Sequence, residues 1–532
     1  MVKVNIYKKI LQDNLPKLLS LYNLDQSSLT YGYGDRVYWG WKISDFANGT
    51  MQGGVHALAI AMKLGLLKNP VFGLRAIDSI IKAIKKIQRK NGSLEEAFPN
   101  ENSFCVTALV AFDVLSAIRH LDKLITYEEK NEYLNIVRPL IYFIENNDEK
   151  HAVISNHLAT AVAAVELWNI LSAEKSARGK DLLDVIYKYQ SKEGWYLEYE
   201  GADPGYQTLC TYYLFCAYEV TKDERLLESL RRSVSFLKYF VHPDGTIGGL
   251  YGSRNTEVYY PGGLVALSSI SEEFSLVACL LHKGVLDANH VFPSDIDTGN
   301  FIPLINAYAV AALHYEKVAK TIEDHRSDAP SKKVFSKNFD RSGIYIHSTD
   351  QYYAIINYKK GGTLKVFNKK TAMVDMEDGG IFGTITNGKR FSTQQFDETQ
   401  DFSNHAIDAG FYAINESYPN PGTSILLRIF GLTFFYSSFF RELFKKLIVR
   451  MLMTKKNRID GSALRRFEFM DDKIIIHEST ARPDGCKHIG HPGKCKAIHM
   501  ASSGYYLKQD QQKPEKSRLV IFRSVNGENS QL

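Results

Sequence analysis

Cysteine is scarce in this sequence, because a chain of 532 residues contains only six. Six cysteines are too few for a disulfide scaffold, and we expect reduced thiols. A secretory leader is also missing, since Lys, Gln, Asp and Pro interrupt the apolar residues of positions 1–24 before a hydrophobic core can form. We therefore expect a cytoplasmic protein. No Walker-type phosphate loop, dinucleotide fingerprint or serine nucleophile elbow occurs, which disfavours the enzyme classes that depend on them.

A strong excess of charge is absent as well. The chain has 65 Lys and Arg against 59 Asp and Glu, a formal net charge of +6, which does not indicate a nucleic-acid partner. The composition, 45% hydrophobic and 23% charged, is that of a globular protein and excludes disordered and collagen-like classes. The length allows two or three domains.

The positive charge is concentrated in residues 421–458, which contain eight Lys and Arg and a single acid. An apolar, aromatic run comes first, and a helix-like stretch with basic residues follows. This pattern is typical of a helix that lies in the headgroup plane at the inner face of a membrane. We predict peripheral membrane association through Arg441, Lys445, Lys446 and Arg450. The alternative is a buried strand and helix whose basic residues face solvent.

Helical periodicity dominates residues 1–325. Apolar residues recur at three- and four-residue spacing in segments 106–121, 158–171, 208–220 and 225–240. The loops between them resemble one another, each with a polar turn at Gly92, Gly194 or Gly245. Gly194 and Gly245 are 51 residues apart, and Gly92 and Gly194 twice that, so we predict a two-helix repeat of about 50 residues. Stacked helical hairpins of this kind open their loops on one rim.

The pattern changes after a polar connector at residues 326–333. Alternating segments such as GIYIHST and RRFEFMDDKIIIHEST predict antiparallel strands, with a turn at Asp471 and Asp472. We therefore predict an α+β multidomain protein. An incomplete (α/α) toroid covers residues 1–325, and an antiparallel β-sandwich covers residues 334–532, with the basic segment inserted at about 421–458.

The repeat loops gather residue types that bind sugars, with aromatic rings for stacking and polar groups for hydrogen bonds. Aromatic rims also occur in helical toroids that bind peptides or lipids, so the rim alone does not identify a ligand. The residues that we predict to contact substrate are Trp39, Trp41, Lys42, Asn102, Trp195, Tyr251, Asn255 and Glu257.

Four further residues suggest a reaction. Asn156 and His157 open one predicted helix, Tyr206 opens the next helical hairpin, and Arg254 lies in the loop after that. If the hairpins stack in order, all four face one cleft. Asn156 and Arg254 can neutralise a uronate carboxylate, which stabilises the enolate formed when the C5 proton leaves. His157 or Tyr206 can remove that proton, and Tyr206 can protonate the departing O4.

These motifs resemble the heparinase II/III and alginate-lyase type of polysaccharide lyases. The resemblance rests on Asn156-His157, Tyr206, the SRNTE run at residues 253–257 and the β domain that follows. It implies an (α/α) toroid with a β-sandwich and an acidic polysaccharide substrate. It also implies that Asn156 neutralises the acid group, that His157 and Tyr206 exchange protons, and that Arg254 assists binding. Many relatives use an additional His from the sandwich, for which His347 and His405 are candidates.

Other interpretations of these residues stay open. Asn156 can cap its helix, Tyr206 can fill the core, and Arg254 can pair with Glu257. If the proton returns to the opposite face of C5, the enzyme is a uronate C5-epimerase. If the protein catalyses no reaction, it is a glycan-binding or assembly protein. A hydrolase would use two of the rim carboxylates, and sequence spacing selects no pair from Asp45, Glu95, Glu96, Glu101, Glu198, Asp203 and Glu257.

Metal ligands are few, and we expect no cofactor. One cluster, Cys486, His488, His491 and Cys495, places four potential zinc ligands within ten residues. This spacing departs from the usual paired-knuckle arrangement, and the surrounding Gly and Pro residues also suit a long hairpin loop. Structural zinc is therefore the less favoured interpretation of this cluster.

Overall fold

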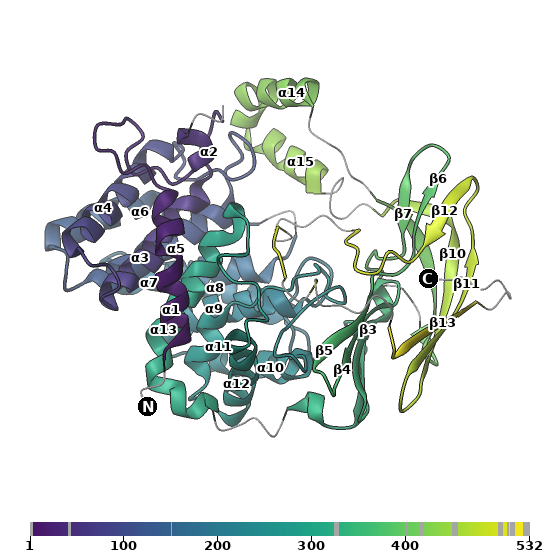
Figure 1. The fold of residues 1–532 in the computed structure, drawn as a ribbon. Coiled ribbons are helices and arrows are strands. Elements are labelled where there is room, and N and C mark those ends of the chain that lie inside the picture. The colour runs from purple at the N-terminus through teal and green to yellow at the C-terminus, as the bar shows by residue number, and fades with distance from the viewer. Residues whose placement is uncertain are drawn as a thin grey trace.

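The computed structural model describes residues 4–40, 44–149, 152–323, 329–398, 400, 402–414, 420–449, 456–497, 504–507, 510 and 517–524. Three residues predicted to act at a site, Trp41, Lys42 and Arg450, lie outside the described residues. The described chain forms a helical domain followed by two sheets (Figure 1).

Among the residues that the structure describes, six inner helices form the wall of the toroid. They are α3 (Val55–Lys63), α5 (Phe104–Leu121), α7 (Ser155–Leu171), α9 (Pro204–Thr221), α11 (Pro261–Leu267) and α13 (Thr298–Glu323). Each contacts the next in order, and α13 also contacts α3. An outer layer packs on them, made of α1 (Ile6–Ser20), α4 (Pro70–Ile87), α6 (Tyr127–Asn146), α8 (Arg178–Tyr189), α10 (Glu224–Leu237) and α12 (Glu272–Leu286).

Amphipathicity separates the two layers. The outer helices α4 and α10 each bury one apolar face, whereas α5 and α7 are buried on nearly all sides. Among the described helices, α5 has the length and composition needed to cross a membrane, but 83% of it is buried inside the toroid. Its apolar character is therefore explained by packing in the core.

The glycines that define the sequence repeat lie at equivalent turns. Gly92, Gly194 and Gly245 have φ angles of 91°, 104° and 79°. A Cβ at Gly92 would lie 2.0 Å from the carbonyl oxygen of Pro139, and one at Gly194 would lie 2.1 Å from that of Arg232. Left-handed backbone and close packing on the next helix both require glycine at these turns.

The β domain begins at Phe335, after the last toroid helix ends at Glu323. A five-stranded antiparallel sheet has the order β1 (Phe335–Phe339), β2 (Ile344–Ser348), β3 (Tyr352–Asn357), β4 (Thr363–Asn368) and β5 (Met373–Asp378). The second sheet has the order β12 (Cys486–Gly490), β6 (Phe382–Ile385), β7 (Arg390–Ser392), β9 (Ala406–Ala413), β10 (Arg458–Phe469), β11 (Ile474–Ala481) and β13 (Val520–Ser524). The short β8 (Phe402–Ser403) pairs with β9. Because β13 runs parallel to β11, the sheet is mixed rather than purely antiparallel.

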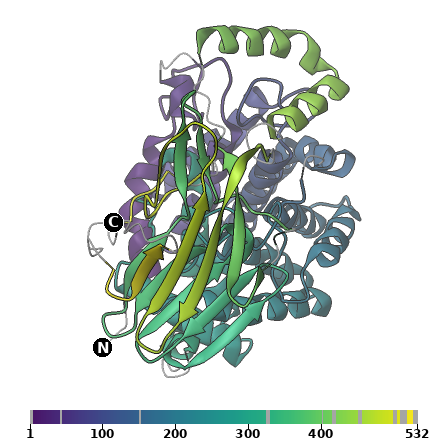
Figure 2. The same ribbon diagram turned by 90° about the vertical axis from the view of Figure 1, so that its right-hand side faces the viewer.

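The five-stranded sheet lies between the toroid and the second sheet (Figures 1 and 2). Every residue of β3 is buried, as expected for a strand covered on both faces. Phe339 packs against Phe236 of α10 with ring centroids 5.0 Å apart. Tyr352 and Ile356 join a core shared with Ile476 of β11. The predicted fold class, a toroid followed by a β-sandwich, is confirmed.

The basic segment forms two helices in place of a buried strand and helix. They are α14 (Pro421–Leu432) and α15 (Ser438–Val449), joined by η5 (Phe434–Tyr436). We call residues 420–449 the helical hairpin. It stands at the top of the molecule in Figure 1, above the loops of the toroid.

Candidate active site

A cavity of about 350 Å³ opens where the inner helices begin. Residues from the starts of α5, α7, α9 and α13 line it, together with the loops before α5 and α9 and Lys445 of α15. Asn156, His157 and Tyr206 all lie on its wall. Three of the four residues predicted to act together are therefore in one cavity.

Local capping explains why two of these helices begin here. The Ser103 hydroxyl accepts the backbone N–H of Val106 to start α5. The Asp203 carboxylate accepts the backbone N–H of Tyr206 at 3.0 Å, and Pro204 occupies the first helical position of α9. The Asp203 cap fixes the backbone of Tyr206 on the cavity wall.

Asn156 does not cap α7, so that alternative is wrong. The residue at the cap position is Ile154, which has no capping side chain. The Asn156 side-chain amide instead donates a hydrogen bond to Glu198 Oε1 at 2.8 Å, and both groups are buried. The amide is therefore already placed to donate to a carboxylate.

His157 has a carboxylate partner of its own. Its Nδ1 lies 2.8 Å from Glu149 Oε2. Burial alone lowers the pKa of His157, but the neighbouring Cys105 sulfur and the Glu149 carboxylate outweigh it and raise the pKa well above its ordinary value. The contact with Glu149 thus favours the protonated imidazole, the form suited to binding negative charge rather than accepting a proton.

Two carboxyl groups in the cavity are close to half-protonated at neutral pH. The Glu96 side chain reaches solvent, but desolvation by the surrounding cavity, with Glu101 adding to the effect, raises its pKa to about 7. Burial also raises the pKa of Glu198 to about 7, against the opposing influence of His157 and the Asn156 amide. Since Glu149 faces His157 and Glu101 lies 3.6 Å from Lys445 Nζ, the cavity is less negative than its four carboxyl groups suggest.

Tyr206 is partly exposed and lines the cavity wall, while part of its side chain also packs against the toroid core. Arg254, by contrast, is buried behind Tyr199, whose ring lines the cavity and lies 3.7 Å from the guanidinium carbon. The Arg254 Nε and Nη2 atoms have no hydrogen-bond partner among the described residues. This cation supports the cavity from behind, a correction to the prediction that it lines the cleft directly.

Four residues predicted to contact substrate are instead buried. Glu257 forms ion pairs with Lys365 and Lys494, so it does not pair with Arg254 either. The remaining three are buried as well. Tyr251 hydrogen-bonds to His242, and Asn255 accepts a hydrogen bond from Lys360. The indole N–H of Trp195 donates to Glu193. Contacts with the β domain and within the loops occupy these side chains, so none lines the cavity.

Two other predicted contacts lie near the rim. Trp39 donates its indole N–H to Leu21 O at 2.8 Å and lies under Arg36, away from the described cavity wall. Asn102, with its side-chain oxygen turned toward Arg441, accepts from Nη1 at 2.8 Å. Asn102 therefore contacts Arg441 and helps to fix the helical hairpin on the toroid.

Lys360 of the β domain fixes the loop that carries Arg254. Its buried ammonium donates to Leu250 O at 2.9 Å, to Gly252 O and to Asn255 Oδ1. Burial lowers the pKa of Lys360 to about 7 although Asp203 opposes the shift. The β domain thus positions a loop of the toroid.

Replacing Lys360 by Met is expected to loosen residues 250–257. Two backbone carbonyls and an amide oxygen lose their donor, and each buried unsatisfied group costs about 1–3 kcal/mol. Hydrogen exchange at residues 250–257 should accelerate relative to the rest of the toroid. Lys359→Met, which removes a lysine at the neighbouring, more exposed position, is the control. Equal protection in the two variants would contradict this role.

The sandwich histidines and the predicted zinc ligands lie elsewhere. His405 Nδ1 lies 2.8 Å from Tyr358 Oη, and His347 Nδ1 lies 2.8 Å from Ser336 Oγ; neither lines the cavity. Among the residues the structure describes, no three His, Cys, Asp or Glu side chains form a group that could hold a metal ion. His491 Nε2 instead lies 2.9 Å from Glu478 Oε1.

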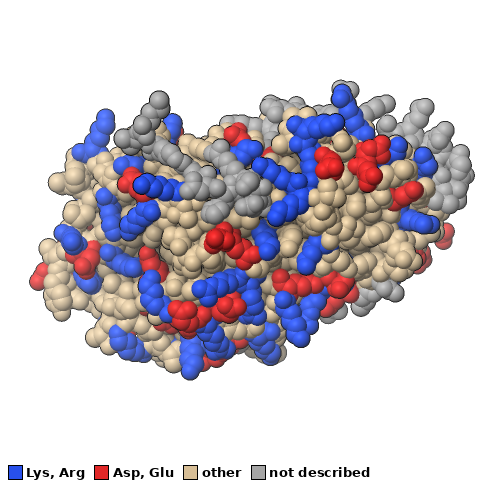
Figure 3. Space-filling view, turned by 90° about the horizontal axis from the view of Figure 1, so that it is seen from below, with Lys and Arg blue, Asp and Glu red and all other residues tan. Residues whose placement is uncertain are grey.

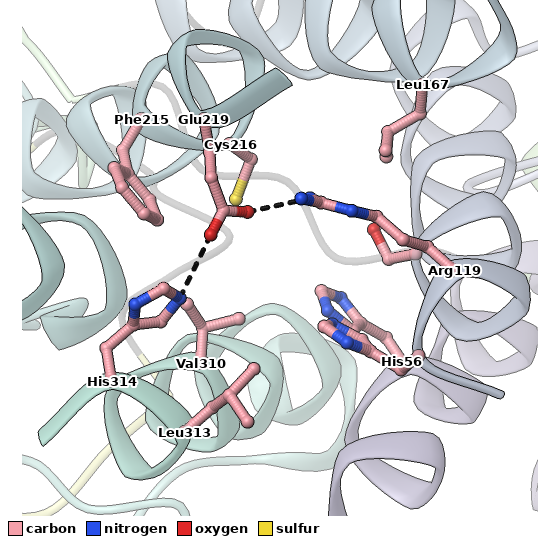
Figure 4. Close-up of a pocket in the computed structure, with 11 residues that line it drawn as sticks. His56, Arg119, Leu167, Phe215, Cys216, Glu219, Val310, Leu313 and His314 are labelled. Atoms are coloured by element: carbon pink, nitrogen blue, oxygen red, sulfur yellow. Dashed lines mark hydrogen bonds and ion pairs between the residues drawn. The ribbon is translucent and has the colours of Figure 1, made fainter. Parts of the chain in front are cut away.

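A second polar cavity lies toward the opposite ends of the inner helices (Figure 4). Glu219 joins Arg119 at 2.7 Å and His314 at 3.5 Å, and His56 lies nearby. Burial lowers the pKa of His56 to about 3. The volume of this second cavity, about 20 Å³, admits a water molecule but no sugar ring.

Sequence reasoning missed several residues of the main cavity. Glu149 precedes α7 in a loop with no motif. Tyr199 belongs to the aromatic residues predicted on the rim, but the sequence did not predict its left-handed backbone, φ 61°. Glu96 and Glu198 are two of the seven carboxyl groups expected on the rim, and nothing in the sequence distinguishes them from the other five. Their placement together on the wall of one cavity is the signal that selects them, and it exists only in the folded chain.

Comparison with known proteins supports the fold. No protein-family model and no curated protein matches the chain. Among solved structures, xanthan lyase from Paenibacillus is similar with a TM-score of 0.50 and 10% identity, covering 88% of this chain and 44% of that one. Chondroitin AC lyase from Streptomyces coelicolor A3 has a TM-score of 0.50 and 11% identity, covering 89% and 66%. Heparinase III has a TM-score of 0.44 and 11% identity, covering 77% and 67%.

The likenesses to xanthan lyase and chondroitin AC lyase define the class of fold, that of the polysaccharide lyases with a helical toroid and a β-sandwich, and the resemblance stated from sequence is confirmed at the level of the fold. The chain spans 44% of the xanthan lyase and 66% of the chondroitin AC lyase. At 10% and 11% identity, the reaction and the substrate depend on the residues of the cavity itself.

Proposed function

We propose that the protein is a polysaccharide lyase that cleaves a uronate-containing glycan by β-elimination. The observation that carries the proposal is the placement of Asn156, His157 and Tyr206 on one cavity wall, where the contact with Glu149 favours the protonated form of His157. An amide and an imidazolium that line one cavity can bind a carboxylate, and the side chain of Tyr206 lines the same cavity.

The chemistry divides among these groups. The uronate carboxylate binds Asn156 and His157, which stabilise the negative charge that develops when the C5 proton leaves. The phenolate form of Tyr206 takes that proton. A C4–C5 double bond forms as the C4–O4 bond breaks, and the Tyr206 phenol then protonates O4. Arg254 adds positive charge from behind Tyr199.

The pH dependence of binding follows from Glu96 and Glu198. Both carboxyl groups protonate as pH falls through about 7, which removes negative charge from the cavity. The KM for an anionic glycan is therefore expected to fall between about pH 8 and about pH 6. Glu198→Gln keeps the acceptor for Asn156 but removes one titrating group, so its KM should vary less with pH. A KM that rises on acidification would contradict this.

A second candidate function is glycoside hydrolysis. The observation in its favour is that two carboxyl groups with a raised pKa, Glu96 and Glu198, line the same cavity. A carboxyl group protonated near neutral pH is suited to serve as a general acid. Hydrolysis would use these residues and would leave Tyr206 without a chemical role.

The deciding experiment is a screen of uronate-containing glycans in D₂O. A lyase produces an unsaturated uronate, detected by its ultraviolet absorbance, in step with chain cleavage. Cleavage without the double bond would identify a hydrolase. Deuterium at C5 without cleavage would identify an epimerase, and binding alone would identify a glycan-binding protein. Each of these three outcomes rejects the lyase.

A further inference from the structure

The helical hairpin exposes an extensive apolar surface. Among the described side chains of residues 420–449, ten large apolar ones are between 45% and 73% exposed. They are Ile425, Leu426, Ile429, Leu432, Phe434, Tyr436, Phe439, Phe440, Leu443 and Leu447. Large side chains present roughly 150–250 Å² each, so the exposed apolar area is on the order of 1,000 Å². Soluble monomers rarely leave a patch larger than a few hundred Å² uncovered.

The exposed side chains share one face of each helix. On α14 they occupy positions 425, 426, 429 and 432, and on α15 positions 439, 440, 443 and 447. Residues three or four positions apart lie on the same side of a helix, so each helix presents a continuous apolar stripe. The connecting turn adds Phe434 and Tyr436.

The other side of the hairpin is docked on the toroid. Phe435 and Phe444 pack against Phe98, each with ring centroids 5.6 Å apart. The carbonyl of Gly431 accepts a hydrogen bond from Asn100 at 2.7 Å, and Arg428 forms an ion pair with Asp45 at 2.7 Å. These contacts fix the orientation of the hairpin, so its apolar stripes face away from the toroid.

Two residues predicted to bind the membrane surface belong to this inner side. Arg441 contacts Asn102, and Lys445 reaches Glu101 and the cavity. Both are therefore part of the toroid contact, a correction to their predicted role as surface anchors. Lys446 is exposed.

Charge indicates which partner suits this surface. Arg428 and Lys445 pair with Asp45 and Glu101 of the toroid, whereas Lys446 is exposed and begins a stretch of sequence, 446–458, with five basic residues and no acid. A symmetric contact with a second copy would bring two sets of excess positive charge together, whereas anionic headgroups would balance it. The face opposite the hairpin carries Lys and Arg interspersed with Asp and Glu, as expected for a surface in water (Figure 3). Helices at a lipid interface combine Tyr, Phe and Leu with Lys, and residues 420–449 have this composition.

We propose that the apolar face of α14 and α15 binds the surface of a bilayer that contains anionic phospholipid. The helices lie in the interface plane, since α14 and α15 have 12 residues each and are too short to span it. Lys445, on the inner side of α15, lines the cavity, so the bilayer surface and the cavity lie on opposite sides of one helix.

The test is flotation of the full chain with phosphatidylcholine vesicles, with and without phosphatidylglycerol. No glycan is involved, so the result is independent of the proposed reaction. We expect binding that is stronger with phosphatidylglycerol and at least about tenfold weaker for Leu443→Glu/Leu447→Glu, because two charges must enter the apolar layer. The control is Leu29→Glu/Val71→Glu, which changes two exposed apolar residues on the toroid.

A second measurement covers the case in which the double variant fails to fold. A Phe439→Trp variant should show a blue shift of its fluorescence when vesicles with phosphatidylglycerol are added. Absence of vesicle binding by the unmodified protein, or equal binding by the hairpin and control variants, would overturn the proposal. A concentration-dependent dimer in light scattering, lost in Leu443→Glu/Leu447→Glu, would assign the surface to a second copy instead.

Discussion

Replacing Tyr206 by Phe is expected to reduce turnover of a uronate glycan by about 10²–10⁴-fold. The substitution removes one oxygen and keeps the ring, so the loss falls on proton transfer. The carboxylate receptor formed by Asn156 and His157 is unchanged, so KM should stay within about twofold. Steady-state kinetics on a substrate found in the glycan screen measures both quantities.

A matched control comes from the same helix. Tyr213 also lines the cavity from α9 but is buried in the core. Tyr213→Phe should retain turnover to within about threefold, since its phenol takes no part in proton transfer. Equal activity of Tyr206→Phe and Tyr213→Phe would show that Tyr206 is not the base, which would contradict the proposed lyase mechanism. The hydrolase that uses Glu96 and Glu198 would then be the better explanation.

Replacing Arg465 by Met is expected to lower the free energy of unfolding by about 3–5 kcal/mol, the usual cost of breaking a buried ion pair. Arg465 of β10 is fully buried. Its guanidinium pairs with Asp378 at the end of β5 and with Glu478 of β11 at 3.2 Å, and it donates to the carbonyls of Gly361 and Gly362 at 3.0 Å. One side chain therefore joins the two sheets.

The physical reason is the charge left behind. Arg465 and the nearby His491 hold the pKa of Asp378 well below its ordinary range despite burial. Without the guanidinium, buried carboxylates lose their main partner and two carbonyls lose a donor. Urea denaturation followed by tryptophan fluorescence and circular dichroism measures the change. Arg466→Met, at the neighbouring exposed position of the same strand, should cost less than about 0.5 kcal/mol. A similar loss in both variants would reject the network as its cause.

The local patterns of the sequence predicted the elements well. The apolar periodicity of segment 106–121 corresponds to α5, which spans Phe104–Leu121, and the turn at Asp471 and Asp472 joins β10 to β11. Helix starts were also predictable. Because inner helices stack in chain order, Asn156 and Tyr206 at successive starts had to approach one cavity.

Burial of the loops was not predictable from the same patterns. Tyr251, Asn255 and Glu257 have the composition of a sugar-binding rim, yet the five-stranded sheet covers them and supplies Lys360 and Lys365 as partners. Those lysines are about 100 residues away in the sequence. No spacing within the toroid reveals that a second domain will cover its loops.

The sequence by itself determined the secondary structure, the order of the helical repeats and the residue types at each helix start, because these depend on contacts between residues near one another in the chain. Only the tertiary structure decided which polar groups share the cavity. It paired Asn156 with Glu198 and His157 with Glu149, and it turned Lys445 inward while leaving Leu443 exposed. The burial and ion pairing of a side chain depend on the segments that pack on it, and those segments are distant in the sequence.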